Sequence, residues 1–348
     1  MRNDQRGPRE ALTRPARRLK SLAIVVPFYN EAPGARHFYE RVRDQLDLLA
    51  ITATLIFVDD GSRDGTLGIL NGIADEDPRV TVLSLARNWG HQTALTAGLD
   101  HVDASAEAVV MMDGDLQHPP ETIRSMIAEY ERGADVVSAV RLQHKGAGWF
   151  KRLTSNGFNA LMTWSTHVEV CEGAADFRLM SLNAVEVLKG MRETHRYLRG
   201  MVPWLGFPSA VVHYEQAPRY AGMPAYTWRR SLRLAHHGLF SFSTLPLNLI
   251  TWLGFFFAAA AGAYLVYVAF VAFYGRTVTG WTSVIGVMLI VSAFQFLAMS
   301  IMAQYLGMVF EETKRRPLYV LKQARIASQG RRVDAPVGFV DSALQRRG

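Results

Sequence analysis

Short apolar runs alternate with longer stretches of mixed polarity through the first part of the chain. The runs are rich in Val, Ile and Leu and have almost no polar residues in their interiors. Strands that are apolar on both faces are typical of a parallel sheet with helices on both sides. The pattern therefore predicts an α/β fold. The expected strands lie in "LAIVVPFYNE", "TLIFVDDGSRDGT", "VTVLSLARN", "EAVVMMDGD" and "ADVVSAVR", and the expected helices cover about 34–50, 65–76, 91–103 and 119–132.

The pattern changes in the last third of the chain, where charged residues almost disappear. No Asp, Glu, Lys or Arg occurs from His236 to Gly275, or from Thr277 to Phe310. Each stretch is longer than the roughly 20 residues with which a helix crosses a bilayer. The sequence therefore predicts two transmembrane helices, at about 247–274 and 281–308.

Basic residues predict the orientation of these two spans. They cluster before the first span and after the second (Arg229, Arg230 and Arg233; Lys314, Arg315 and Arg316), whereas the connecting loop holds only Arg276. The positive-inside rule then places both flanks and the N-terminal domain in the cytoplasm. The single Cys171 agrees, since it can form no internal disulfide. Given the spans, the net charge of +7 favours anionic lipid over nucleic acid as its partner.

Polar residues gather where the expected strands end. In an open α/β sheet, ligands bind at the carboxyl ends of the strands, so these clusters indicate one binding crevice. The strand-end residues include Pro27, Tyr29, Glu31, Asp59, Asp60, Asp113, Asp115 and Arg141.

The kind of ligand follows from which motifs are present. The first strand is followed by "PFYNE" in place of GxGxxG, and the chain has no GxxxxGK[ST] loop. A calcium loop beginning at Asp113 would need Gly and Glu where His118 and Arg124 stand. Asp113 and Asp115, joined by Gln117, instead suit Mg²⁺ or Mn²⁺ shared with substrate phosphates.

The sequence resembles family 2 glycosyltransferases of GT-A fold, and within them the polyprenyl-phosphate branch of dolichyl-phosphate mannose synthases and bactoprenol glucosyltransferases. The resemblance covers about residues 20 to 320. It rests on the order of "VVPFYNE", "VDDGSRDGT", "RNWGHQTALTAGLD", "DGDLQHPPE", "DFRLM", "LRGMVPWLGF" and "YAGMPAY".

The resemblance implies a role for each matching residue. The nucleotide would be held by Pro27, Tyr29, Glu31, Asp59, Asp60 and Asp113. The metal would be held by Asp113, Asp115 and Gln117. Catalysis would involve Asp176, Arg178 and Asp115, and Arg141 and Arg178 would face phosphate. Where relatives carry a lysine that meets phosphate, this chain has Ala225, and Arg229 or Arg230 is the expected replacement.

These inferences predict how the chain is organised. A disordered basic tail (1–20) precedes a GT-A domain (21–225), an amphipathic interface helix (226–244), the two spans (245–310) and a cytoplasmic basic tail (311–348). The interface helix follows from apolar residues at helical spacing in "YTWRRSLRLAHHGLFSF". A homo-oligomer is compatible with the sequence but is not specified by it.

The predicted function is inverting, metal-dependent transfer of a sugar from a nucleotide diphosphate sugar to undecaprenyl or another polyprenyl phosphate, as a multi-pass enzyme of the bacterial inner membrane. UDP-glucose is the first choice of donor. Two alternatives stay open. One is a processive polysaccharide synthase of the same fold, although the chain lacks Gln-x-x-Arg-Trp. The other is a catalytically silent nucleotide-binding scaffold in the membrane.

Overall fold

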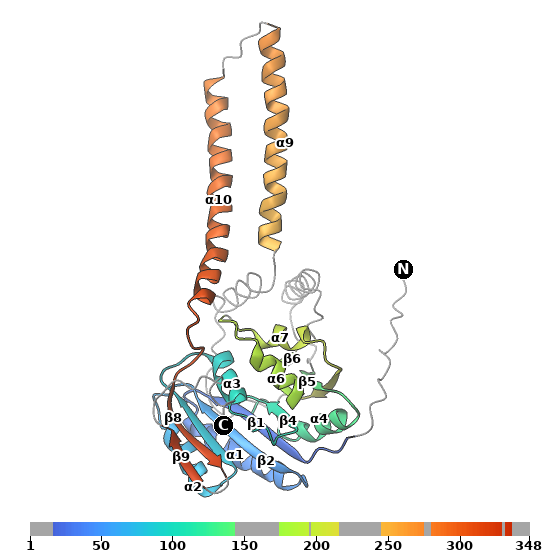
Figure 1. Cartoon of the computed structure of the whole chain (residues 1–348), viewed down its shortest axis with the longest axis vertical. Coiled ribbons are helices and arrows are strands. Elements are labelled where there is room, and N and C mark those ends of the chain that lie inside the picture. Colours follow the sequence, from blue (N-terminus) through green and yellow to red (C-terminus); the bar gives the residue numbers. More distant parts are fainter. Residues whose placement is uncertain are drawn as a thin grey trace. The chain divides into compact units, whose positions relative to one another are not determined.

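The computed structural model describes residues 17–142, 174–194, 196–215, 245–274, 280–328 and 331–335. The chain divides into two compact units. The first holds a sheet with its covering helices, and the second holds two long helices (Figure 1). The predicted interface helix at 226–244 lies outside the described residues.

The first unit is built on a mixed sheet whose described strands follow the order β7-β5-β6-β4-β1-β2-β3-β8-β9. Strands β1 to β4 are parallel neighbours, and β7 is parallel to β5. β6 runs antiparallel between β4 and β5, and β8 runs antiparallel to β3. The mostly parallel sheet is therefore confirmed. The strands are β1 (Ser21–Phe28), β2 (Thr52–Asp59), β3 (Val80–Leu85), β4 (Ala108–Met111), β5 (Val136–Arg141), β6 (Ala174–Ser181), β7 (Ser209–Tyr214), β8 (Leu321–Ser328) and β9 (Arg331–Ala335).

Helices cover both faces of this sheet, as the apolar strands require. On one face, Phe38 and Val42 of α1 and Met126 of α4 join the β-strand side chains in one apolar core. On the other face α3 packs so closely that a Cβ on Gly98 would lie 2.2 Å from Val25 Cγ1. The helices are α1 (Ala32–Asp47), α2 (Thr66–Glu76), α3 (His91–Asp100), α4 (Thr122–Glu131), α6 (Leu182–Gly190) and α7 (Leu198–Trp204).

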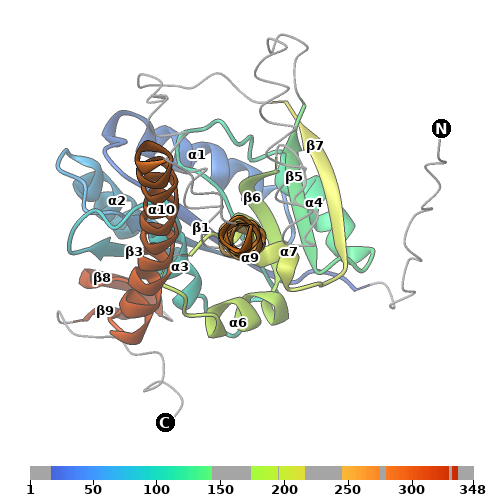
Figure 2. The same cartoon turned by 90° about the horizontal axis from the view of Figure 1, so that it is seen from above.

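Both predicted tails, 1–20 and 311–348, include residues that belong to the folded unit. At the N-terminus, Arg17 donates to the carbonyl of Tyr130 and pairs with Asp135, so residues 17–20 belong to the folded unit. At the C-terminus, residues 321–328 and 331–335 are strands of the sheet. β8 covers the edge of β3, with Leu321 and Ala324 buried. An uncovered β3 would present a row of unpaired backbone groups, which is why a covering strand is favourable there. β9 and β7 lie at the two ends of the sheet (Figure 2).

The second unit consists of α9 (Leu245–Phe273) and α10 (Trp281–Thr313), which run side by side (Figure 1). Phe257 and Phe294 meet between them at 4.5 Å between ring centroids. By length and composition, the segment Ile290–Thr313 can cross a membrane, and Ile250–Tyr264 is a shorter apolar segment. The helical form of both predicted spans is confirmed, and their crossing of a membrane twice stays a prediction.

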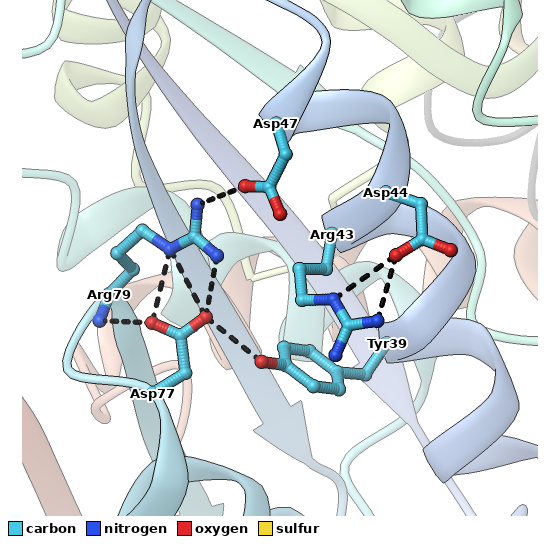
Figure 3. Close-up of polar contacts among 6 residues, drawn as sticks. All are labelled: Tyr39, Arg43, Asp44, Asp47, Asp77 and Arg79. Carbon is cyan, nitrogen blue, oxygen red and sulfur yellow. Dashed lines mark hydrogen bonds and ion pairs between the residues drawn. The ribbon is translucent and has the colours of Figure 1, made fainter.

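A polar cluster ties α1 to the turn that precedes β3 (Figure 3). Tyr39 donates from its hydroxyl to Asp77 Oδ2 at 3.0 Å, and Arg79 pairs with the same carboxylate at 2.9 Å. Burial opposes the charge of Asp77, but its hydrogen bonds from Arg79 and Tyr39 hold its pKa below the ordinary value. Within the described residues Asp44 pairs with the neighbouring Arg43 alone, and its side chain is 63 % exposed, against 7 % for Asp77.

Asp77→Ala should therefore lower the free energy of unfolding by about 1–3 kcal/mol, because it leaves the buried Tyr39 hydroxyl without its acceptor and removes one of the two carboxylates that pair with Arg79. Asp44→Ala is the matched control and should change it by no more than about 0.5 kcal/mol. Urea unfolding of the two purified variants measures both values. Equal effects of the two changes would show that the Asp77 cluster does not stabilise the unit.

Candidate active site

The polar strand ends predicted from the sequence do converge on one edge of the sheet. β1, β2, β4 and β5 all end there, and the antiparallel β6 begins there. The chain order reverses at β1, whose neighbours are β2 and β4. Such a switch point is where open α/β sheets bind their ligands.

The loops after β1 and β2 are fastened to each other. Asn30 adopts a positive φ of 53°, and its side chain accepts a hydrogen bond from the backbone N–H of Arg63 at 2.9 Å. The N–H of Glu31 donates to Thr66 Oγ1 at 3.0 Å. Pro27 is buried in β1, while Tyr29 is exposed at the crevice edge. The predicted nucleotide-binding residues of β1 thus stand on a braced loop.

Asp59 and Asp60 are both buried, and the chain's own donors bind them. Asp59 accepts from the Ser84 hydroxyl at 3.2 Å, and Asp60 accepts from the N–H groups of Trp89 and Gly90 at 2.7 and 2.9 Å. Burial raises the pKa of Asp60 although the two N–H groups oppose the shift. These two aspartates therefore shape the loops around the crevice, and their contact with a nucleotide stays a prediction.

The loop after β4 is tightly built around Asp113 and Asp115. A Cβ on Gly114 would lie 2.5 Å from the ring of Phe28, so only glycine fits between the two aspartates. Leu116 has a positive φ of 63°, which is strained for a branched side chain. The N–H of Gln117 donates to Asp115 Oδ1 at 3.1 Å. The close approach at Gly114 and the backbone of Leu116 thus restrict the loop that carries the two carboxylates.

His118 fixes the position of Asp113, a role that the sequence did not predict. The N–H of Asp113 donates to His118 Nδ1 at 3.0 Å, so the ring's proton is on Nε2, which lies 3.7 Å from Asp113 Oδ2. The buried ring stacks on Phe177 at 4.9 Å and meets Tyr214 edge to face. The position of His118 in "DLQHPP", close after Asp113, could have indicated a role, but sequence spacing alone does not reveal the hydrogen bond between them.

Asp176 lies at the start of β6 and is 3 % exposed. Arg199 donates to both of its oxygens at 3.1 and 3.0 Å, Gln92 donates to Oδ2 at 3.2 Å, and His91 Nε2 lies 3.3 Å from Oδ2. Burial alone would raise the pKa of Asp176, but the contacts with His91 and Arg199 outweigh it and hold this pKa well below its ordinary value. Asp176 is therefore an ionised, fully engaged carboxylate.

His91 joins the two acidic centres. Its Nε2 lies 3.3 Å from Asp113 Oδ1 as well as 3.3 Å from Asp176 Oδ2. Burial disfavours its charged form, but the nearby carboxylates raise the pKa of His91 overall. Sequence reasoning gave no role to His91, Gln92 or Arg199, although all three lie in the motifs "RNWGHQTALTAGLD" and "LRGMVPWLGF".

The predicted phosphate-binding arginines differ in their exposure to solvent. Arg178 is 2 % exposed, and its Nη1 donates to the Leu198 carbonyl at 3.3 Å. Arg141 is exposed at the end of β5, opposite Tyr214. The predicted replacement cations Arg229 and Arg230, and Ala225, lie outside the described residues. The phosphate-binding role of these arginines stays a prediction.

Tyr214 shows that the charged groups form one electrostatic unit. Burial raises the pKa of its hydroxyl, and the charges of Asp113, Arg141, Asp115 and Arg199 all act on it. Charges that act on one hydroxyl lie within the same small region. The ends of β4 and β5, the start of β6 and the start of α7 therefore lie around one acidic and basic crevice.

The crevice fits a divalent cation only when other ligands contribute. In the described part of the chain, no group of three or more His, Cys, Asp or Glu side chains could hold a metal ion by itself. The buried Oδ1 of Asp113, however, accepts no hydrogen bond from the described residues, although His91 Nε2 lies 3.3 Å away. Such an oxygen normally has a partner, and a hard cation prefers carboxylate oxygen. Asp113 and Asp115 therefore suit a cation whose remaining ligands come from substrate.

Comparisons with known proteins identify the family. Residues 23–188 match the model for glycosyl transferase family 2. The chain is 35 % identical to a prophage bactoprenol glucosyl transferase homolog of Escherichia coli and 36 % identical to a bactoprenol glucosyl transferase of Shigella phage SfV, each over 307 residues that cover 87 % of this chain and 99 % of the relative. It is 36 % identical to an uncharacterized glycosyltransferase of Bacillus subtilis over 87 % of this chain and 93 % of that protein.

A more distant likeness is found among solved structures. A mannosyltransferase of Pyrobaculum calidifontis, solved with GDP-Man and Mn²⁺, is 18 % identical with a TM-score of 0.44 over 86 % of this chain and 91 % of that one. The family match and the identity to full-length relatives decide the assignment. The chain belongs to glycosyl transferase family 2, and it is a glycosyltransferase.

The contacts of His118 predict that its loss will disturb Asp113. His118→Ala should reduce sugar transfer by about 10- to 100-fold, the usual effect of removing a partner that orients a ligand side chain. His118→Asn should lose less, because its side-chain oxygen can still accept the Asp113 N–H. Transfer rates and Mn²⁺ titration of both variants provide the measurement. If Asn is as damaging as Ala in both assays, the hydrogen bond to Asp113 is not what His118 contributes.

Proposed function

We propose that this glycosyltransferase moves a sugar from a nucleotide diphosphate sugar to a polyprenyl phosphate at the cytoplasmic face of a bacterial inner membrane. The observation that carries the proposal is the identity of 35–36 % to bactoprenol glucosyl transferases along nearly their whole length. Their name specifies transfer of glucose, so UDP-glucose, the donor expected from the sequence, is the first donor to test. The apolar segment Ile290–Thr313 supports attachment to the membrane in which such an acceptor is dissolved.

The proposed reaction is a single displacement at the anomeric carbon, with inversion. An oxygen of the acceptor phosphate forms a bond to this carbon while the bond from carbon to the nucleoside diphosphate breaks, and the bonding electrons leave with the diphosphate. The acceptor is a phosphate monoester, whose second pKa of about 6 makes it mostly dianionic at neutral pH. The attack therefore requires no side chain to remove a proton.

The residues of the crevice divide the work between them. Tyr29, Glu31 and the loops braced by Asp59 and Asp60 would hold the nucleotide. Asp113 and Asp115, with Gln117, would hold Mg²⁺ or Mn²⁺, which supplies positive charge to the leaving diphosphate. His118 keeps Asp113 in place for this task.

Loss of one metal ligand tests the metal assignment. Asp115→Asn should keep the fold, because the residue is only partly buried and the amide oxygen can still accept the Gln117 N–H, but it should remove most transfer. Chelation should do the same to the parent enzyme. The assay follows radiolabelled sugar from UDP-glucose into extractable lipid. Full activity in excess chelator would overturn the metal assignment, and labelled polymer or no product would favour the synthase or the silent scaffold.

Labelling from each side of the membrane tests the topology. A cysteine placed at position 276, in a Cys171→Ala background, should react with an impermeant thiol reagent only from the periplasmic side, because the basic flanks favour the cytoplasm. A cysteine in place of Ser328, at the end of β8, is the matched control and should react only from the cytoplasmic side. Labelling of both positions from the same side would contradict two crossings.

A further inference from the structure

Arg199 is bound to a buried carboxylate but remains partly exposed to solvent. Its Nε and Nη2 donate to the two oxygens of Asp176, which is buried. The arginine side chain itself is 38 % exposed. In the described part of the chain its third nitrogen, Nη1, donates to no acceptor. Arg199 is thus anchored on one side and keeps donor capacity on the other.

Gln92 holds the first turn of α7 at the same centre. Its Nε2 donates to Asp176 Oδ2 at 3.2 Å, while its Oε1 accepts the backbone N–H of Leu198 at 2.9 Å. The residue next to Leu198 is Arg199. Because backbone and side chain are both held, the guanidinium loses little further freedom when it binds an anion. Its planar fork of donors also matches the oxygens of a phosphate.

The order of the strands places Asp176, the partner of Arg199, on the far side of the proposed metal ligands from the proposed nucleotide residues. The proposed nucleotide residues follow β1 and β2, the proposed metal ligands follow β4, and Asp176 begins β6, on the far side of β4 from β1. In an inverting displacement the nucleophile approaches the anomeric carbon opposite the leaving diphosphate. A cation beyond β4 is therefore placed for the nucleophile. The charge of Arg199 also acts on Asp113, so it lies close to the proposed metal site.

The two other arginines expected to contact phosphate are less well placed for the phosphate of the acceptor. Arg178 is buried and turned toward the Leu198 carbonyl, and Arg141 lies on the far side of β6 at the end of β5. We propose that Arg199 binds the phosphate monoester of the acceptor, and that Asp176 orients Arg199 and takes no proton during the transfer. This inference rests on the proposed function, which supplies a phosphate as the nucleophile.

The contacts of Asp176 support this division of roles. Its two oxygens already receive hydrogen bonds from Arg199 and Gln92. A carboxylate that must remove a proton needs an oxygen within reach of that proton. The dianionic acceptor requires no such step. Asp176 therefore acts through Arg199 as a positioning residue.

The test compares two substitutions of Arg199 with one matched control. Arg199→Gln removes the charge, and Arg199→Lys keeps the charge but loses the fork. Arg192→Gln is the control, because Arg192 also pairs with both oxygens of an aspartate (Asp100 at 2.8 and 2.9 Å) and is equally exposed at 40 %, but it lies outside the crevice. Kinetics are measured in detergent with undecaprenyl phosphate and with UDP-glucose varied separately, and binding of farnesyl phosphate is measured by calorimetry.

Arg199→Gln should raise KM for undecaprenyl phosphate by about 10- to 100-fold, as expected for loss of a charge-assisted hydrogen bond, and weaken farnesyl phosphate binding to match. KM for UDP-glucose should change by less than about twofold, since the donor contacts are made elsewhere. Arg199→Lys should recover part of the loss, and Arg192→Gln should behave like the parent.

Three outcomes would overturn the assignment. A rise in KM for UDP-glucose alone would place the donor diphosphate, not the acceptor, at Arg199. Kinetics of Arg199→Gln equal to those of Arg192→Gln would leave Arg199 without a role in substrate binding. If Arg199→Gln and Arg199→Lys lose transfer activity equally and both have lowered thermal stability, the contact between Arg199 and Asp176 has a structural role only. If the parent enzyme itself transfers no sugar to polyprenyl phosphate, the proposed function fails and the acceptor assignment fails with it.

Discussion

The geometry of the crevice depends on one buried charge, the carboxylate of Asp176. A buried carboxylate is costly unless it is paired and hydrogen-bonded. Arg199 and Gln92 provide these partners, and His91 approaches the same oxygen as Gln92. Because these residues begin α7 and α3, the charge fixes the start of two helices against β6. His91 also reaches Asp113, so the same interaction sets the distance between the acidic centre of β6 and that of β4.

The acidic residues of the strand ends fall into two groups with different tasks. Asp59 and Asp60 are buried and bind donors of neighbouring loops, so their charge is used to build the crevice. Asp113 and Asp115 are only partly buried, in a loop that tolerates strain at Leu116 and excludes any side chain at position 114. Strain that the surrounding structure maintains is typical of functional loops. The second group is therefore the one suited to meet substrate and metal.

The sequence predicts local secondary structure and the position of the crevice better than it predicts contacts between residues far apart in the chain. Apolar runs identify β1 to β5 and α1 to α4 to within a few residues, and strand ends identify the crevice, because local pattern determines both. The elements β6, β7, α6 and α7 were not among those expected. The hairpin of β8 and β9 was missed because "LKQARIAS" follows a predicted span and reads as a basic tail, while its pairing with β3 is a long-range contact. The partners of Asp176 were missed for the same reason: Gln92 is 84 residues away, and no spacing rule relates them. Burial of Arg178 was also inaccessible, since a strand pattern predicts the face of a residue but not its depth.

Helix α3 connects the crevice to the segment that follows α10. Its first residues hold Asp176 and Asp113, and its last residue, Asp100, accepts a hydrogen bond from the Tyr319 hydroxyl at 3.0 Å and pairs with Arg192. Between these ends the helix has little room to move, because Gly98 packs directly against Val25 and Val58 of the sheet. Tyr319 precedes β8, which is itself a strand of the sheet. Within the first unit, the segment from Tyr319 to β8 is therefore held both to α3, which carries His91 and Gln92, and to β3, which precedes α3.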